Sequence, residues 1–349
     1  MAKPVRARAA LRRSLISLFA ATAWAGAISL AQAQTPVADF YKGQTVRMIN
    51  WAAAGGEYDI HGKLVSRHIG RHIPGQPTVI HSTMTGGGGL VAANHLYNVA
   101  PRDGTSLGMM VSTTPLLQAV GEKAVKYDAA KFDWLGSISP SVENLVAWHT
   151  SPARRFEDLL SQEFVLGASG AGSTSVISPT VMNALLGTKI KIVPGYPGGS
   201  QINIAMERGE SMGRWNTWSA WKVTHPDWIR ERKIIPLVQS ALSKPADLQD
   251  APLLIDLAKN EDDRAIFTLL ATSAELGRPI AVAPETPRER FAALDAAFRA
   301  TMQDAEFLKE AAALKIEVTP VFAPQMRALV ERALATPKPL AERLGKLMQ

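Results

Sequence analysis

A strand, a loop of small residues and a helix follow one another between Thr45 and Ile60, and this stretch constrains the fold more than any other. Thr45–Trp51 is rich in β-branched and aromatic residues, as expected for a buried strand. Residues 52–56 read Ala-Ala-Ala-Gly-Gly, so a ligand can approach the backbone closely. Asp59 is the expected N-cap of the helix that follows. The positive end of that helix would suit an anion.

Strands alternate with helices along the rest of the chain, and further loops of small residues follow strands at 85–89, 169–175 and 195–199. Such strand–loop–helix units predict an α/β fold with mostly parallel sheets and helices on both faces. The length suggests two lobes. We expect lobe 1 to comprise residues 34–147 and 275–349, and lobe 2 to comprise 148–274. The chain would cross between them near Leu145–Ser151 and Thr272–Val282.

The N-terminus has the pattern of a secretory signal peptide. Five basic residues and no acidic one precede a mostly apolar segment at 15–30, and Ala31-Gln32-Ala33 matches a small-x-small cleavage site. We predict a signal peptide over residues 1–33, cleaved after Ala33. The sequence contains no cysteine, which excludes disulfides and a lipoprotein anchor.

Removal of the signal peptide changes the net charge, and so changes what the basic composition implies. The chain has a formal net charge of +7, of which the five basic residues of the signal peptide account for +5, so the mature protein carries +2. Nucleic-acid binding requires a basic patch on the folded domain. We therefore expect no nucleic-acid partner.

The loops at the carboxyl ends of the strands supply the candidate ligand-binding residues. Ligands of open α/β sheets bind at these ends, and a cleft between lobes is a usual site. Hydroxyls, amides and bare backbone suit noncovalent binding of a small anion or polar molecule. The candidates are Ala54, Gly55, Gly56, Thr85, Gly86, Thr113, Ser169, Ser173, Thr174, Tyr196 and Asn216.

Two other features allow alternative interpretations. His61, His68 and His72 share a stripe of the first helix, which fits either a metal site or, as we favour, a solvated basic face. Trp215, Trp218 and Trp221 recur every three residues, so they would either stack on an aromatic ligand or pack in the core. We expect no metal and no cofactor.

An enzyme is the other functional class that the sequence allows. Residues 167–171 almost match a nucleophile elbow, but Ala171 replaces the last glycine. A hydrolase that uses Ser169 would need a histidine partner, for which His149 and His225 are candidates. No P-loop and no His-Glu-x-x-His zinc motif occurs. We therefore expect no catalytic residue, with a serine hydrolase as the alternative.

The ordered series of loop motifs resembles the periplasmic substrate-binding receptors of tripartite tricarboxylate transporters. Each motif is short, but their order and spacing match over essentially the whole mature chain. The motifs are Ala54-Gly55-Gly56-Glu57-Tyr58-Asp59, the glycines 86–89, residues 97–105, residues 167–175, Gly195-Tyr196-Pro197-Gly198-Gly199 and Gly277-Arg278-Pro279.

The resemblance implies a periplasmic, two-lobed "Venus flytrap" receptor of type II. Such a receptor closes on a small carboxylate and delivers it to membrane permease subunits, and we expect it to be a monomer. By motif match, the resemblance assigns the carboxylate grip to Ala54, Gly55, Ser169, Gly172, Ser173 and Thr174. The sequence departs from the family at Glu57, whose carboxylate would weaken anion binding unless it is paired or points away.

Overall fold

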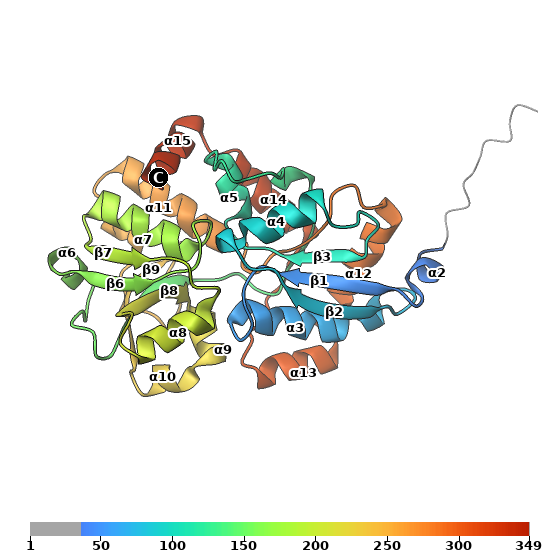
Figure 1. The fold of residues 1–349 in the computed structure, drawn as a ribbon, viewed down its shortest axis with the longest axis horizontal. Helices are drawn as coiled ribbons and strands as arrows, with labels where there is room; N and C mark the ends of the chain where they lie inside the picture. Colours follow the sequence, from blue (N-terminus) through green and yellow to red (C-terminus); the bar gives the residue numbers. More distant parts are fainter. Residues whose placement is uncertain (1–35, 349) are drawn as a thin grey trace, which may run out of the picture.

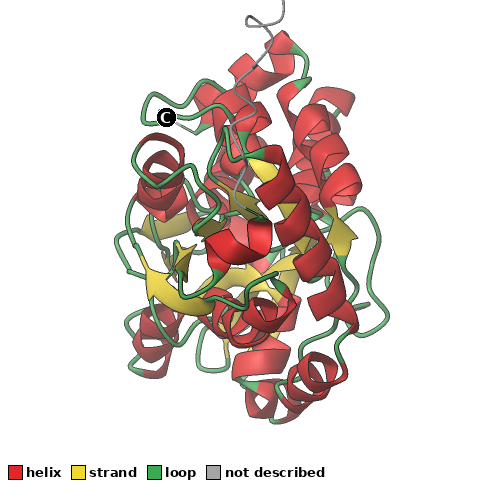
Figure 2. Ribbon diagram, turned by 90° about the vertical axis from the view of Figure 1, so that its right-hand side faces the viewer, coloured by secondary structure: helices red, strands yellow, loops and turns green. Residues whose placement is uncertain are grey.

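The computed structural model describes residues 36–348. The predicted signal peptide, residues 1–33, lies outside the described residues. The chain forms two α/β lobes side by side, each with its own sheet (Figure 1). In both lobes the strands are enclosed between helices (Figure 2). None of the helices between residues 36 and 348 combines the length and the hydrophobicity that crossing a bilayer requires.

The first lobe is built on a six-stranded sheet in the order β11-β4-β10-β3-β1-β2. Helices α3, α12 and α13 bury one face of it around Leu64, Phe298 and Phe307. Helices α4, α5 and α14 cover the other face. The strands are β1 (Thr45–Asn50), β2 (Thr78–Thr83), β3 (Ser106–Met109), β4 (Asp133–Ser137), β10 (Ile280–Val282) and β11 (Val321–Phe322); the helices are α2 (Val37–Tyr41), α3 (Glu57–Ile69), α4 (Leu90–Asn98), α5 (Thr114–Ala119), α12 (Arg288–Gln303), α13 (Ala305–Ala313) and α14 (Ala323–Leu334).

The second lobe is built on a five-stranded sheet in the order β7-β6-β8-β5-β9. A tryptophan-rich cluster fills the space beneath α9 and α10. The C-terminal helix α15 packs on α7 and α11. The strands are β5 (Glu143–Trp148), β6 (Phe164–Gly167), β7 (Ile190–Val193), β8 (Gly213–Thr217) and β9 (Ile234–Ser240); the helices are α6 (Asp158–Ser161), α7 (Thr174–Leu186), α8 (Gly199–Glu207), α9 (Trp218–Thr224), α10 (Pro226–Arg230), α11 (Glu261–Ala274) and α15 (Lys338–Leu347).

The two-lobed α/β fold agrees with the prediction, but both sheets are mixed rather than mostly parallel. Strands β1, β2 and β3 are parallel to one another, as are β6, β7 and β8. In contrast, β5 and β10 run antiparallel to both of their neighbours. Each of these two is the first strand that the chain forms after crossing to the other lobe. It enters its sheet without the right-handed helical crossover that makes neighbouring strands parallel.

The chain passes from the first sheet to the second after Ser137 and returns before Ile280. Leu145–Trp148 belongs to β5, so the first crossing precedes the predicted segment Leu145–Ser151. The two connections touch, because a Cβ on Gly277 would lie 2.0 Å from the carbonyl oxygen of Ser139. Gly277 also has a φ of +63°, which favours glycine.

One hydrophobic cluster continues from lobe to lobe. It includes Leu117 of α5 and Met326 of α14 on the first lobe, and Leu185 of α7 and Phe267 of α11 on the second. Leu344 of α15 belongs to the same cluster. The lobes are therefore joined by packing as well as by the two chain connections.

Candidate functional site

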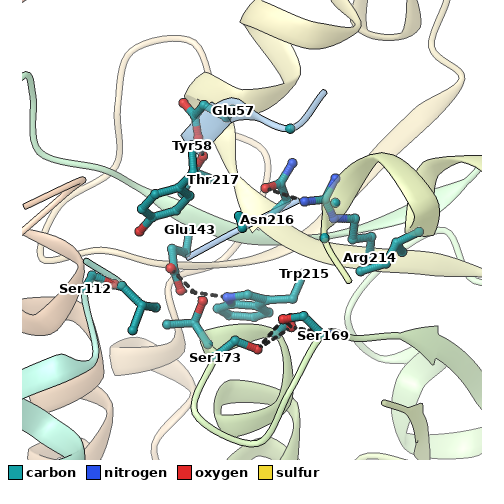
Figure 3. A pocket seen from close by; sticks show the side chains of 18 of the residues that line it. Glu57, Tyr58, Ser112, Glu143, Ser169, Ser173, Arg214, Trp215, Asn216 and Thr217 are labelled. Atoms are coloured by element: carbon teal, nitrogen blue, oxygen red, sulfur yellow. Dashed lines mark hydrogen bonds between the residues drawn. The ribbon is translucent and has the colours of Figure 1, made fainter. Parts of the chain in front are cut away.

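A cavity of about 70 Å³ lies between the lobes and is lined by residues from both. The first lobe contributes the loop after β1 and the start of α3, with Trp51, Glu57 and Tyr58. The second lobe contributes the loop after β6 and the end of β8 (Figure 3). One buried water needs roughly 10–15 Å³, so this cavity has room for a small molecule.

The lobes are closed in this structure, because loops from opposite sides contact each other directly. The amide of Gly172 donates to the carbonyl of Gly87 at 3.1 Å, and the hydroxyl of Ser200 donates to the carbonyl of Ala54 at 2.9 Å. A Cβ on Gly170 would lie 2.2 Å from the amide nitrogen of Gly88. Only glycine permits this backbone-to-backbone contact.

Eight of the twelve predicted site residues line cavities. Gly56, Ser169, Ser173, Thr174 and Asn216 line the cavity described above. Thr85, Gly86 and Tyr196, again with Ser169, line a second cavity of about 190 Å³ that shares Trp51 with the first.

The other four predicted residues make contacts within the protein. Ala54 accepts the bond from Ser200, and the amide of Gly55 donates to Asp59 at 2.9 Å. Thr113 donates from its hydroxyl to the carbonyl of Gly172 at 2.5 Å, across the lobe boundary. In this closed form these groups hold loops together.

Asp59 is not the N-cap of α3, contrary to the prediction. The N-cap is Gly56, and α3 begins at Glu57, so Asp59 lies in the first turn. Its carboxylate instead bonds back to Gly55 and to the side chains of Lys63 and His81, at 2.7 and 2.9 Å. Asp59 therefore holds the first loop in place by a hydrogen bond from the first turn of α3.

Three serine hydroxyls form a cluster at the start of α7. Ser173 lies 2.7 Å from both Ser169 and Ser175, measured between hydroxyl oxygens. Within residues 36–348 neither His149 nor His225 hydrogen-bonds to Ser169, and His225 stacks on Trp228 instead. The geometry thus gives no support to the hydrolase alternative.

Glu57 forms an ion pair with Arg278, which meets the condition set in the sequence analysis that its carboxylate be paired. Its carboxylate accepts from Arg278, whose side chain is fully buried, and from the hydroxyl of Thr217 at 2.6 Å. Burial alone would raise the pKa of Glu57, but the charge of Arg278, the nearby His61 and the hydrogen bonds from Thr217 and Arg278 together hold this pKa below its usual value. Thr217 belongs to the second lobe, so this contact also links the lobes.

Glu143 and Arg214 line the cavity but were absent from the predicted site. Glu143 accepts from the indole of Trp215 at 2.7 Å and from the hydroxyl of Thr174 at 2.8 Å. Burial raises the pKa of Glu143, although both of these hydrogen bonds lower it. Arg214 donates to Asn203 at 2.8 Å and to Asn216 at 3.1 Å.

The sequence contained a pattern that could have placed Arg214 at the cavity, but only a weak one for Glu143. Arg214 lies two residues before Asn216 on β8, so both face the same side of the strand. Glu143 starts β5, whose six residues are all buried and show no alternation. Its partner across the sheet is Thr217, which brings it to the cavity.

The three tryptophans were expected either to stack on a ligand or to pack in the core, and the structure places them in different surroundings. Trp215 lines the cavity, whereas Trp218 and Trp221 belong to the buried cluster with Trp148 and Trp228. Strand β8 ends at Thr217, so Trp218 and Trp221 lie on α9 and face inward.

The histidine stripe is not a solvated face. His61 and His68 are buried, and His61 bonds to the carbonyl of Glu57 at 2.9 Å. Helix α13 and the residue that caps it cover the stripe and supply carboxylates, with Glu310 2.6 Å from His68 and Asp304 2.9 Å from His72. In the described part of the chain no group of three or more potential ligands is arranged to hold a metal ion.

No protein-family model matches the sequence, and no curated protein sequence matches it. Solved structures do match. The periplasmic binding protein BugD has a TM-score of 0.69 at 17% identity, covering 88% of this chain and 98% of that one. Rpa4515 of R. palustris, solved with adipate, has a TM-score of 0.66 at 19% identity, with coverage of 86% and 97%.

A third match is MatC (Rpa3494) from Rhodopseudomonas palustris with bound malate, with a TM-score of 0.66 at 18% identity, covering 88% of this chain and 99% of that one. A TctC solute-binding protein from Polaromonas matches with a TM-score of 0.56 at 15% identity, with coverage of 87% and 99%. BugD is a periplasmic binding protein, and the TctC protein is a solute-binding protein. The chain therefore shares its fold with the periplasmic binding protein BugD, with MatC and with TctC, as the loop motifs predicted.

Proposed function

We propose that this protein is a periplasmic solute-binding receptor that captures a small carboxylate between its lobes and delivers it to a membrane permease. The main support is the cavity between the lobes. Both lobes contribute polar side chains to it, and Arg214 is among the residues that line it. A guanidinium that bonds only to amide oxygens retains its full positive charge for an anion. The adipate and malate bound to Rpa4515 and MatC are anions of this kind.

Capture would proceed by rotation of the lobes about the two chain connections. Contacts that form only in the closed state favour that state when the ligand bridges both lobes. We assign residues up to 137 and 280–334 to the first lobe, and residues 143–274 and 338–347 to the second, because β5 belongs to the second sheet and α15 packs on α7 and α11. The predicted bounds, which placed residues 143–147 and 338–347 in the first lobe, are corrected accordingly. The pivot would then lie at 138–142 and 275–279.

The ligand contacts that we propose comprise the twelve sequence candidates together with Arg214. Gly56, Ser169, Ser173, Thr174 and Asn216 line the cavity that holds Arg214. Thr85, Gly86 and Tyr196 would act from the second cavity, and Ala54, Gly55, Thr113 and Gly172 through the loops that meet on closure.

The partners that we propose are the permease subunits of a tripartite transporter, and the receptor would act as a monomer. Export would require the signal peptide, cleaved after Ala33. Mass spectrometry of the secreted protein should then find Gln34 as its first residue. Light scattering should give the mass of one chain.

The decisive test is a thermal-shift screen of the mature chain, residues 34–349, against small carboxylates that include adipate and malate. A ligand at 100 times its Kd should stabilise the protein by about 2.7 kcal/mol. The diamides of the same acids are the controls, since they keep the size and lose the charge. Stabilisation by a carboxylate and not by its diamide, with one site by calorimetry, is the expected result. No stabilisation by any carboxylate would contradict the proposal.

A further inference from the structure

The cavity contains charge of both signs, which a receptor for a plain carboxylate does not need. Glu57, Glu143 and Arg214 all line it. Glu57 is compensated by Arg278. In residues 36–348, however, no ion pair within 4.0 Å involves Glu143 or Arg214. Closing the lobes without a ligand thus leaves one carboxylate and one guanidinium with no oppositely charged group in direct contact.

We propose that the ligand carries a protonated amine as well as a carboxylate, with the amine bound at Glu143 and the carboxylate at Arg214. This inference rests on the proposed function and specifies the class of its ligand. Figure 3 shows Glu143 and Arg214 on either side of Trp215, and all three residues line the same cavity. The ligand would then neutralise both ends of the site at once.

The Glu143 end suits a cation. The residue is only 6% exposed, and each of its carboxylate oxygens accepts one hydrogen bond from the protein, which leaves lone pairs free. Aromatic rings of Trp51, Tyr58 and Trp215 line the same cavity, and the faces of such rings attract an ammonium group. Burial disfavours the ionised form of Glu143 when no counter-charge is in contact, and a ligand ammonium would supply that counter-charge.

The Arg214 end suits an anion. Its Nε is buried and has no hydrogen-bond partner, and the same is true of Nδ2 of Asn216 beside it. Both are donors. A Cβ on Gly199 would lie 1.9 Å from Nη2 of Arg214, so the guanidinium packs against the first turn of the nine-residue helix α8. Burial lowers the pKa of Arg214 from 12.5 to about 10, so it remains protonated at neutral pH.

The test compares carboxylates in pairs that differ only by an amine: succinate with aspartate, glutarate with glutamate, and adipate with 2-aminoadipate. Calorimetry on the wild-type mature chain should show that the amino member of the best-fitting pair binds about tenfold more tightly or better. Glu143→Gln keeps the size of the side chain and removes its charge, so it should bring that ratio close to one. Arg214→Gln should weaken both members of the pair alike.

Glu163→Gln is the matched control, since this side chain of the same lobe is 65% exposed, and it should leave the ratio unchanged. If Glu143→Gln does not fold, the wild-type ratio decides alone. Equal or tighter binding of the acid without the amine would overturn the inference and leave the proposed function intact. If no acid of either kind binds, the proposed function fails and the inference fails with it.

Discussion

Arg278 and Glu57 form an ion pair that solvent hardly reaches, with side chains that are 0% and 4% exposed. Arg278 lies on the connection that returns to the first lobe, and Glu57 opens α3. Arg278 also donates to Thr217 and Ser219 of the second lobe, at 2.9 and 2.8 Å. One buried guanidinium therefore ties the helix, the connection and the other lobe together.

Arg278→Met should destabilise the protein by about 3–5 kcal/mol, because it leaves Glu57 buried without its counter-charge. Urea unfolding measures the loss. Glu57→Gln combined with Arg278→Met removes both charges and should recover much of it. Arg230→Met is the control, since this arginine and its partner Glu231 are 73% and 44% exposed, and it should cost less than about 1 kcal/mol. Equal losses of stability in the Arg278 and Arg230 variants would show that burial of the Arg278–Glu57 pair does not add to its contribution.

Gly170→Ala should hinder closure. The new methyl group would meet the backbone of Gly88, which cannot move aside as a flexible side chain would. Overpacking of this kind costs about 1–3 kcal/mol, which should appear as weaker ligand binding, with small-angle scattering reporting a less compact liganded form. The neighbouring exposed residue provides the control, Ala171→Ser. Unchanged affinity would mean that the loops do not meet when the ligand binds.

Ser173→Ala combined with Thr174→Ala should weaken ligand binding by about 1–3 kcal/mol, as expected when buried polar groups lose their partners. The change removes a hydroxyl from the serine cluster and the Thr174 bond to Glu143. Thr180→Ala is the control, because its hydroxyl bonds to the carbonyl of Val176 within the same helix. Calorimetry that gave the same affinity for the double variant and the wild type would remove this loop from the ligand site.

Stability should fall as the pH drops from about 6.5 to 4 because of His61. Burial, which Arg278 reinforces, lowers the pKa of this residue from 6.5 to about 4. In that interval the unfolded chain binds a proton that the folded chain does not, so protons favour unfolding, and about 3 kcal/mol is lost by pH 4. Above pH 6.5 both states are neutral and the effect is absent.

His61→Gln keeps a donor for the carbonyl of Glu57 and cannot titrate, so its unfolding free energy should depend less steeply on pH across this interval. Comparing the slopes of the two proteins isolates His61, because the other titrating groups are common to both. Identical slopes would mean that His61 binds its proton equally well in the folded and the unfolded protein.

The sequence was sufficient for the lobes and for the loops that face the cleft, because strand and helix periods and glycine-rich turns are local signals. It was not sufficient for strand direction, since β5 and β10 join their sheets through contacts distant in the chain. The serine and threonine loop could be proposed from the sequence because its residues are consecutive. Glu143, Arg214 and Arg278 were missed because their importance depends on burial and on partners up to 221 positions away.

The shared cluster behind α7, α11, α14 and α15 limits how the molecule can come apart. Neither lobe has a complete hydrophobic core of its own near these helices, because Leu344 and Met326 belong to a cluster with residues of both lobes. The lobes must therefore open by a rotation that keeps this shared hydrophobic cluster packed. Heating should accordingly melt the whole protein in one cooperative step, with no stage at which one half is folded and the other is not.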